Sequence, residues 1–469
     1  MNVRSMNQQE KVDYMLSEPV PHLVCQMAVP TIISMLVTSF YNMVDTFFVG
    51  RLNTQATAAV GVVFSVMAFI QAFGFFFGHG SGNFISRKLG AGEFEESNRM
   101  AAVGFFTAFF AGIVAGVLGI IFLTPLARAL GSTPTILPYT KDYLRIILMG
   151  CPFMMSSLVL NNQLRFQGSA SYAMVGIVTG AVLNIVLDPL LIFTFDMRVA
   201  GAALATVVSQ VVSFVILFLM SMKGGNIRIS FHNFKPSWAL YKEVFRGGIP
   251  SLCRQGLASI AQVCLNHSAG IFGGDFSDAA IAALSIVGRI SMFANSALIG
   301  FGQGFQPVCG MNYGAKQYGR VRQAFFFCVK YATVFLVVVS VSGLIFAEPL
   351  LTLFRKEDAD VIRIGTLALR LQCLVFPLNA WIVMCNMMLQ SIGKAAKASL
   401  VAAARQGIFF IPLIWILPMF FSLLGVQMCQ TWSDICSFLL SLPLGISVLR
   451  EMKGNEDFLR SESTQPKKI

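Results

Sequence analysis

Charged residues are scarce in this chain. Asp, Glu, Lys and Arg together make up 12% of its 469 residues, whereas soluble domains carry about 25%. Hydrophobic residues make up 56%, and the mean hydropathy is +0.71. This balance argues against a soluble enzyme, a nucleic-acid-binding protein and a disordered chain. We therefore expect a protein of the lipid bilayer with no nucleic-acid partner.

Residues that build metal sites and disulfides are few or scattered. The chain has only four histidines, and its ten cysteines include no C-x-x-C pair. The motifs G-x-S-x-G and H-E-x-x-H are also missing. These absences argue against a membrane-embedded enzyme, a metal site and a cofactor. The cysteines are expected to act as small apolar packing residues.

Long apolar runs are what the chain does have. A membrane-spanning helix needs about 20 apolar residues. Because the polar first 19 residues are not followed by a cleavage site, the first run is expected to remain as an anchor. The sequence predicts an all-α integral membrane protein with twelve transmembrane helices, at 20–48, 57–80, 100–123, 138–162, 172–195, 199–221, 247–272, 279–301, 323–346, 362–389, 398–420 and 424–448.

The second half of the chain repeats features of the first at a displacement of 224 or 225 residues. Glycines expected in loops after the second and eighth spans recur, as do a proline, an asparagine and a glycine farther on. The matched pairs are Gly78 and Gly302, Gly80 and Gly304, Gly90 and Gly314, Pro152 and Pro377, Asn161 and Asn386, and Gly168 and Gly393. Since each repeat contains an even number of spans, we expect two six-helix lobes related by a pseudo-twofold along the membrane normal.

The distribution of positive charge predicts the domains and their orientation. The net charge is +12, and most Lys and Arg residues lie in segments that share one side with the two termini. The positive-inside rule places that side in the cytoplasm. The predicted parts are a cytoplasmic tail (1–19), a first lobe (20–221), a cytoplasmic connector (222–246), a second lobe (247–449) and a cytoplasmic tail (450–469).

Two acidic residues lie within the predicted spans of the first half. Charges in the hydrocarbon region are costly and mark function by default. Asp45 is the last residue of a polar face on the first helix. Asp188 lies on the same helix face as Asn184 and directly precedes Pro189. With Thr206 of the sixth helix, Asp45, Asn184 and Asp188 are predicted to bind a coupling cation, H⁺ or Na⁺. The alternative is that these acids only hydrogen-bond neighbouring helices.

The second half carries a polar stripe without an acid, so the cation site is predicted in the first half alone. Arg289 is expected to gate a cavity, attract an anionic group or pair with a helix-end carbonyl. Arg405 is expected to extend to the cytoplasmic interface, and Asp434 lies in the last span. The predicted substrate cavity comprises polar residues of both halves: Tyr41, Asn42, Gln210, Gln255, Ser259, Gln262, Asn266 and Arg289.

Three motifs carry a family resemblance that covers roughly residues 18–450. The motifs are Tyr41-Asn42-Met43-Val44-Asp45-Thr46, Asn184-Ile185-Val186-Leu187-Asp188-Pro189 and Gly201-Ala202-Ala203-Leu204-Ala205-Thr206. Together with the paired glycines, they resemble the multidrug and toxic compound extrusion family of secondary transporters. The resemblance implies two six-helix lobes around a central cavity and export of organic, often cationic compounds in exchange for H⁺ or Na⁺. The lack of an acid in 247–272 resembles the DinF-like branch.

These observations together predict a proton-coupled multidrug efflux transporter that works by alternating access. Its expected partners are small-molecule drugs, dyes or organic cations and the lipid bilayer, and its expected location is a bacterial cytoplasmic (inner) membrane, as a monomer. The alternatives are a Na⁺-coupled antiporter of the same fold and a lipid or oligosaccharide-lipid flippase of the same superfamily. A passive channel is disfavoured by the buried acids and the duplicated lobes.

Overall fold

The computed structural model describes residues 6–52, 54–223, 225–354 and 358–464, and every regular element in these ranges is a helix. Residues 1–5 and 465–469 of the two predicted tails lie outside the described residues. The first half contains α1 (Gln8–Ser17), α2 (Val20–Gly50), α3 (Thr54–Gly90), α4 (Phe94–Ile121), α5 (Leu123–Ala129), α6 (Leu137–Phe166), α7 (Ala170–Pro189), the π-helix η2 (Leu190–Thr194) and α8 (Arg198–Ser221).

The second half follows a connector that includes the short helix η3 (Phe231–Asn233). Its elements are α9 (Trp238–Phe272), η4 (Gly274–Phe276), α10 (Ser277–Gly314), α11 (Tyr318–Phe354), α12 (Ala359–Val375), α13 (Leu378–Ser391), α14 (Ala395–Ala403), the π-helix η5 (Ala404–Ile408) and α15 (Phe410–Thr464). The all-α prediction is confirmed. Because α9 begins at Trp238, the predicted connector 222–246 is helical over its last part.

Nine helices within the described ranges are long and apolar enough to cross a membrane, and the pair α12 and α13, bent by 58°, adds a tenth. The helix α9 is not among the ten, and its sequence includes polar residues such as Gln255, Gln262 and Asn266, yet it packs along α3 like its apolar neighbours. The remaining crossing lies between α14 and the end of α15. The chain is helical throughout this stretch, so two spans are counted as one.

This stretch reverses direction at Ser422, whose φ of 49° and ψ of −130° are not helical. Contacts across the reversal are antiparallel, since the Cys429 Sγ donates to the Phe410 carbonyl (3.6 Å) and the Ser433 Oγ to the Arg405 carbonyl (2.6 Å). Gly425 permits the close turn, because a Cβ there would lie 2.5 Å from the backbone of Leu417. The fold therefore contains the twelve predicted spans.

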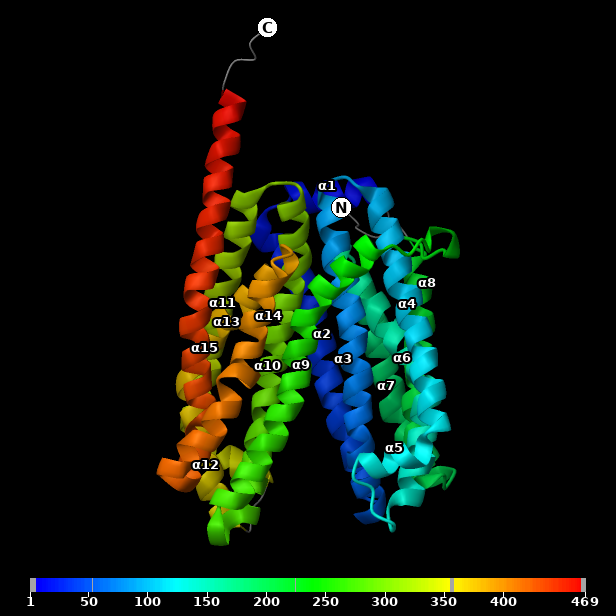
Figure 1. The fold of residues 1–469 in the computed structure, drawn as a ribbon, viewed down its shortest axis with the longest axis vertical. Helices are drawn as coiled ribbons and strands as arrows, with labels where there is room; N and C mark the ends of the chain where they lie inside the picture. The colour runs from blue at the N-terminus through cyan, green and yellow to red at the C-terminus, as the bar shows by residue number, and fades with distance from the viewer. Residues whose placement is uncertain (1–5, 53, 224, 355–357, 465–469) are drawn as a thin grey trace.

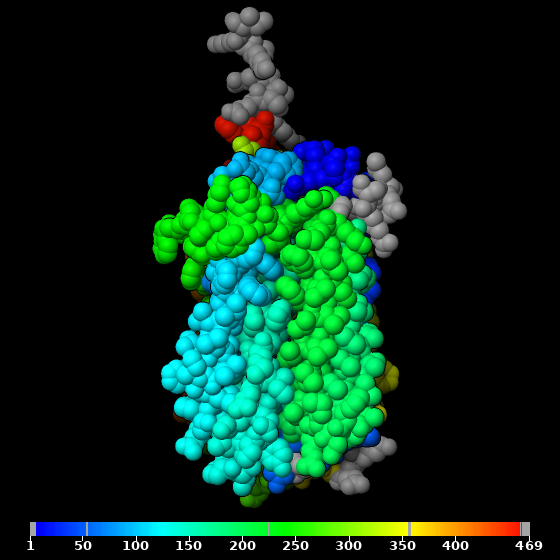
Figure 2. All heavy atoms as spheres, turned by 90° about the vertical axis from the view of Figure 1, so that its right-hand side faces the viewer, coloured from blue at the N-terminus to red at the C-terminus, as the bar shows by residue number. Residues whose placement is uncertain are grey.

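Figure 1 shows the two halves converging at the end that carries both termini and diverging toward the opposite end. Across the junction α2 packs against α10, and α3 packs against α9. The first span of each half therefore packs against the second span of the other half, as a pseudo-twofold requires. In Figure 2 the outer face of the first half is lined by α4 and α8, and the bright green connector crosses its upper end beside the dark blue α1.

The predicted glycine loops after the second and eighth spans are wrong. The chain stays helical through Gly90 in α3 and through Gly314 in α10. These glycines permit backbone contact between the halves: a Cβ on Gly90 would lie 1.9 Å from the Met311 carbonyl oxygen, and one on Gly314 would lie 1.9 Å from that of Arg87. A glycine inside a helix costs about 1 kcal/mol relative to alanine, and this close packing offsets that cost.

The internal repeat is confirmed by matching contacts. The side-chain amide of Asn161 donates to a backbone carbonyl twelve residues farther on (3.1 Å), and that of Asn386 does the same (2.7 Å). Gly168 and Gly393, which follow the helices that carry these asparagines, both have a φ of +83°. Left-handed backbone of this kind favours glycine, so the same helix ending is encoded in both halves.

The N-terminal helix α1 is fastened to the first half through a buried lysine. The Nζ of Lys11, which is only 3% exposed, donates to Ser169 Oγ (2.8 Å) and to Asn226 Oδ1 (2.7 Å). Ser169 lies between α6 and α7, and Asn226 lies in the connector. These contacts link α1 to the connector at the end of the bundle.

Docking of α1 is expected to strengthen as the pH rises from about 8 toward 10.5. Burial lowers the pKa of Lys11 from 10.5 to about 8, so the protonated amine disfavours the docked helix. Docking is therefore weakest below pH 8 and gains as the proton is lost. Hydrogen exchange of α1 amides, corrected for intrinsic rates, should show more protection at pH 9.5 than at 7.5. An equal gain in Lys11→Met would contradict this assignment.

Candidate functional site

The predicted acids of α2 and α7 meet in the first half. The carboxyl groups of Asp45 and Asp188 lie within hydrogen-bonding reach of each other. Asp188 is fully buried, and the Nδ2 of the buried Asn184 donates to its Oδ1 (3.4 Å). Directly after Asp188 the helix passes through Pro189 into the wider π-helical turn η2. The structure thus brings three of the four predicted cation-site residues into direct contact.

Several oxygens of this cluster are buried and accept no hydrogen bond. They are Oδ1 of Asp45, Oδ1 of Asn184 and Oδ2 of Asp188. Buried polar atoms in proteins are nearly always partnered, so this concentration is unusual. Carboxylate and amide oxygens suit a proton shared by the acids or a hard cation such as Na⁺. The donor set therefore fits either predicted coupling ion.

A tyrosine that the sequence reasoning missed completes the surroundings of the acids. Tyr143 of α6 is fully buried; its hydroxyl donates to the Met67 sulfur (3.9 Å) and lies near Thr206 and the carboxyl groups of Asp45 and Asp188. Thr206 in turn donates to the Ala202 carbonyl of its own helix (3.1 Å). The sequence carries no distinct signal for Tyr143, because a tyrosine near the end of a span is normally an interfacial anchor.

A polar cavity of about 190 Å³ lies next to the acids. Its lining includes Tyr41, Asn42, Asn184, Thr206 and Gln210, and α10 of the other half contributes Met292 and Ser296. The structure therefore brings together the three first-half residues predicted to line a substrate cavity and joins them to the cation-site residues. No Lys or Arg is among the described residues that line this cavity.

The remaining residues predicted for the substrate cavity do not join it. Gln262 lines a separate cavity of about 210 Å³ within the second half, and its Nε2 donates to Asn266 Oδ1 (3.1 Å). Arg289 is exposed. Gln255, Ser259, Asn266 and Arg289 line neither of these two cavities. Ser259 and Gln262 are exposed on α9, and neither lines the cavity beside the acids.

The expectation that Arg405 extends to the cytoplasmic interface is wrong. Its guanidinium forms an ion pair with the fully buried Asp434, with 2.8 Å from Nε to Oδ1. The reversal at Ser422 folds the last helix back along η5 and places the carboxylate beside the arginine. Pairing within the bundle replaces solvation at the interface.

A buried arginine that was expected in a loop joins the two halves. Because α6 continues to Phe166, Arg165 is helical and only 1% exposed. Its guanidinium donates to Gln303 Oε1 of α10 and to Asn162 Oδ1 (2.6 Å), and it is hydrogen-bonded to His79 Nε2 (3.2 Å). Arg165 has no carboxylate partner among the described residues.

Arg87 makes a second polar link across the junction. It forms an ion pair with Glu243 of α9 (3.1 Å) and donates to the Ser391 carbonyl of α13 (3.0 Å). Both partners belong to the second half, whereas Arg87 belongs to α3. Together with the glycine contacts and Arg165, this link closes the end of the molecule that carries the termini.

The substitution Arg165→Lys is expected to lower transport severalfold and to reduce the thermal stability of the purified protein. A lysine cannot reproduce the guanidinium fork that contacts three side chains at once, and hydrogen bonds to charged groups contribute about 1.5–3 kcal/mol each. Thermal unfolding and initial rates of dye transport check this. The control is Arg99→Lys, since Arg99 pairs with Glu95 on the surface of α4. Equal melting temperatures for both variants would refute the bridging role of Arg165.

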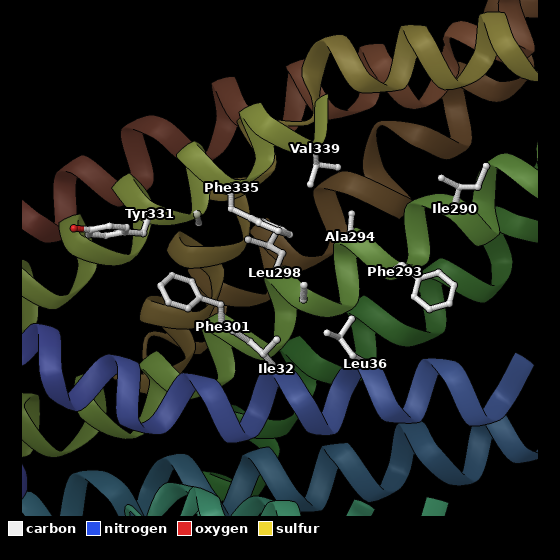
Figure 3. A pocket seen from close by; sticks show the side chains of 12 residues that line it. Ile32, Leu36, Ile290, Phe293, Ala294, Leu298, Phe301, Tyr331, Phe335 and Val339 are labelled. Atoms are coloured by element: carbon white, nitrogen blue, oxygen red, sulfur yellow. The ribbon is translucent and has the colours of Figure 1, made fainter. Parts of the chain in front are cut away.

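An apolar cavity of about 600 Å³ lies apart from these polar groups (Figure 3). It is bounded by α2 of the first half and by α10 and α11 of the second. Figure 3 shows Leu36 of α2, Phe301 of α10 and Phe335 of α11 around the space. Its walls therefore belong to both halves.

Comparison with known proteins decides the family. Residues 30–190 and residues 256–416 each match the MatE family model. The chain belongs to the MatE family. One match falls in each half, as the internal repeat requires, and the resemblance to multidrug and toxic compound extrusion transporters is confirmed. MatE proteins are membrane transporters, so this chain is a multi-pass membrane protein of a transporter family.

Relatives of this MatE protein match over most of their length. The Multidrug export protein MepA of Staphylococcus haemolyticus is 28% identical over 92% of this chain and 94% of its own length. MepA of Staphylococcus aureus (strain MSSA476) is 27% identical, over 89% and 91%.

Solved structures of transporters share the fold. One is described as the outward-facing conformation of a multidrug resistance MATE family transporter of the MOP superfamily. It has a TM-score of 0.88 and 25% identity, and covers 96% of this chain and 99% of that chain. A MOP superfamily transporter from Pyrococcus furiosus, whose binding pocket is described as having reverse polarity, also has a TM-score of 0.88, with 26% identity over 96% and 99%.

Proposed function

We propose that this MatE protein exports small organic compounds, often cationic, in exchange for inward H⁺. The observation that carries the proposal is the pair of the half-buried Asp45 and the fully buried Asp188, whose unpartnered oxygens lie beside a polar cavity. Its relatives named multidrug export proteins support the choice of substrate class. The lining of that cavity gives no basic residue to hold a pyrophosphate, which disfavours the flippase alternative.

The geometry suggests how the ion and the substrate compete. An ionised acid pair attracts a cationic compound into the neighbouring cavity. Protonation from the outside removes that attraction and lets the acids bond to each other. Since Asp45 is on α2 and Asp188 on α7, the change alters the contact between these two helices. The compound then leaves through the diverging end.

The orientation follows from the same proposal. With both termini in the cytoplasm, the closed end faces inward and the diverging end faces outward. We further propose a monomer in a bacterial inner membrane that belongs to the DinF-like branch. Its lobes are residues 20–221 and 247–449, and its cytoplasmic parts are 1–19, 222–246 and 450–469. The coupling site consists of Asp45, Asn184, Asp188 and Thr206, and the substrate cavity is lined by Tyr41, Asn42 and Gln210.

Transport in proteoliposomes tests the proposal. Dye movement is measured under an imposed pH gradient, an imposed Na⁺ gradient, and neither. Acceleration by the pH gradient alone is expected. Acceleration by Na⁺ alone would assign the Na⁺-coupled alternative. Counterflow separates an exporter from a channel, since only an alternating-access carrier transiently accumulates labelled dye when the vesicles are preloaded with unlabelled dye. Dye leakage without counterflow would overturn the proposal.

A further inference from the structure

The second half contains its own internal polar cavity, of about 210 Å³, between α9, α10, α12, η5 and α15. Amide side chains dominate its polar lining, and one charged group joins them. The amides are Gln262, Asn295, Gln372, Gln406, Gln427 and Gln430, and the charged group is Arg405.

The carboxylate behind this cavity is fully satisfied. Asp434 is fully buried and paired with the Nε of Arg405 (2.8 Å), and it also accepts hydrogen bonds from Gln430 Nε2 (2.7 Å) and Asn379 Nδ2 (3.0 Å). None of its oxygens is among the buried atoms without a partner. This is the reverse of the acid pair in the first half, where one oxygen of each carboxyl group accepts nothing.

The local backbone is built to hold the arginine in place. Arg405 lies in the π-helical turn η5, and π-turns inside helices are frequent at functional sites. Such a turn disturbs the regular carbonyl pairing, and the Ser433 hydroxyl donates to the Arg405 carbonyl (2.6 Å). Ser433 adjoins Asp434, so one segment of α15 holds both the backbone and the side chain of Arg405.

The repeat places this ion pair at the counterpart of the first-half cavity, since displacement by 224 residues takes Ala181 to Arg405, about one helical turn from the counterpart of Asn184. Displacement by 224 residues takes Gly201 to Gly425, where both glycines permit close approach to the preceding helix. The same displacement takes Thr206 to Gln430 and Gln210 to Asp434. Thr206 and Gln210 line the first-half cavity, and Gln430 lines the second-half cavity. The two cavities are therefore equivalent places in the two lobes.

We propose that the Arg405 guanidinium is a tethered cation that permanently neutralises Asp434 in the second-half counterpart of the cavity beside which the first half takes an exchangeable cation. Arginine stays charged under all physiological conditions, and its fork matches a carboxylate. Because it cannot leave, the second half takes no part in cation exchange. This inference rests on the proposed function and adds to it that one lobe alone sets the coupling.

Removing the tethered cation should expose a latent cation site. A buried carboxylate without its partner is strongly unfavourable, and binding a proton or Na⁺ relieves this. Among the described residues Asp434 has no charged partner besides Arg405: Asn379 and Gln430 are neutral, and Cys429 is the titratable group on which its charge acts. Thus Arg405→Gln should turn the second half into a cation-binding lobe.

The test uses thermal unfolding of the full-length protein carrying Asp45→Asn and Asp188→Asn, which removes the first-half site. In this background the melting temperature should not change when NaCl replaces choline chloride. A change from pH 8.5 to 6 should shift it no more than in the control that also carries Arg405→Gln and Asp434→Asn. Adding Arg405→Gln should produce an upward shift of about 2 °C or more with Na⁺ or with protons, as for any ligand that binds only the folded state.

Two matched variants define the outcome. Arg405→Lys keeps the tethered charge, and Arg405→Gln combined with Asp434→Asn removes the carboxylate, so both should stay unresponsive. A response in the second variant, or none in folded Arg405→Gln, would overturn the inference. If the background itself still responds like the natural protein, the proposed first-half site fails instead.

Asp434→Asn alone provides a second measurement. Its unpaired guanidinium should make the melting temperature respond when chloride replaces gluconate, and no response would count against the inference.

Discussion

Asparagine in place of Asp188 is expected to reduce gradient-driven export about 10-fold or more without unfolding the protein. Free energies of coupling between two ligands are about 1–3 kcal/mol, equivalent to 5–150-fold in affinity, and this substitution removes the group that changes charge. Asparagine has nearly the same shape and keeps one acceptor toward Asn184. The variant can therefore still bind dye, but it cannot transmit the proton gradient to dye movement.

Rates in proteoliposomes under a pH gradient measure this effect, and counterflow without a gradient shows whether the binding cavity survives. Asp142→Asn is the matched control, because Asp142 is an exposed acid at the start of α6. Asp45→Asn should behave like Asp188→Asn, since the two carboxyl groups act as one unit. Normal export by either variant down a proton gradient would refute the assignment of the coupling site.

Valine in place of Gly90 or Gly314 should prevent closure of the junction between the halves. Each added Cβ would lie 1.9 Å from a backbone carbonyl oxygen of the opposite half, and a backbone atom cannot move aside as a flexible side chain can. Overpacking costs about 1–3 kcal/mol, which shifts the population of the closed form by about 5- to 150-fold. Transport should fall by a similar factor.

Spin labels at the exposed positions 95 and 316, one in each half, would measure the separation at this end of the molecule. We expect longer distances in Gly90→Val and in Gly314→Val than in the natural protein. Gly454→Val is the control, because a Cβ at Gly454 meets nothing within 4 Å. Unchanged distances with normal transport would show that the glycine contacts do not control closure.

The fold was largely predictable because the bilayer imposes simple length rules. Apolar runs predicted the crossings, and recurrence of Asn161 and Gly168 at 386 and 393 predicted the duplication. The glycines near the junction were misplaced in loops, because glycine marks both a turn and a close helix contact. Which of the two applies depends on the opposite half, as Gly90 and Met311 show.

The residues of the candidate site were predictable only where the polar side chains lie on one face of a single helix. Asp188 and Asn184 share a face of one helix, and an acid in a span is conspicuous. Tyr143, Arg165 and the pairing of Arg405 with Asp434 depend on contacts between helices distant in sequence. Nothing in the local pattern separates a buried arginine from one at the membrane surface.

The apolar cavity of Figure 3 ties the protein to the physical state of its bilayer. Since its walls belong to both halves, any rocking of one half against the other changes its volume. Lipid chains are the apolar material available to enter or leave such a space. We therefore expect turnover to depend on lateral pressure and chain order in the bilayer as well as on ion gradients.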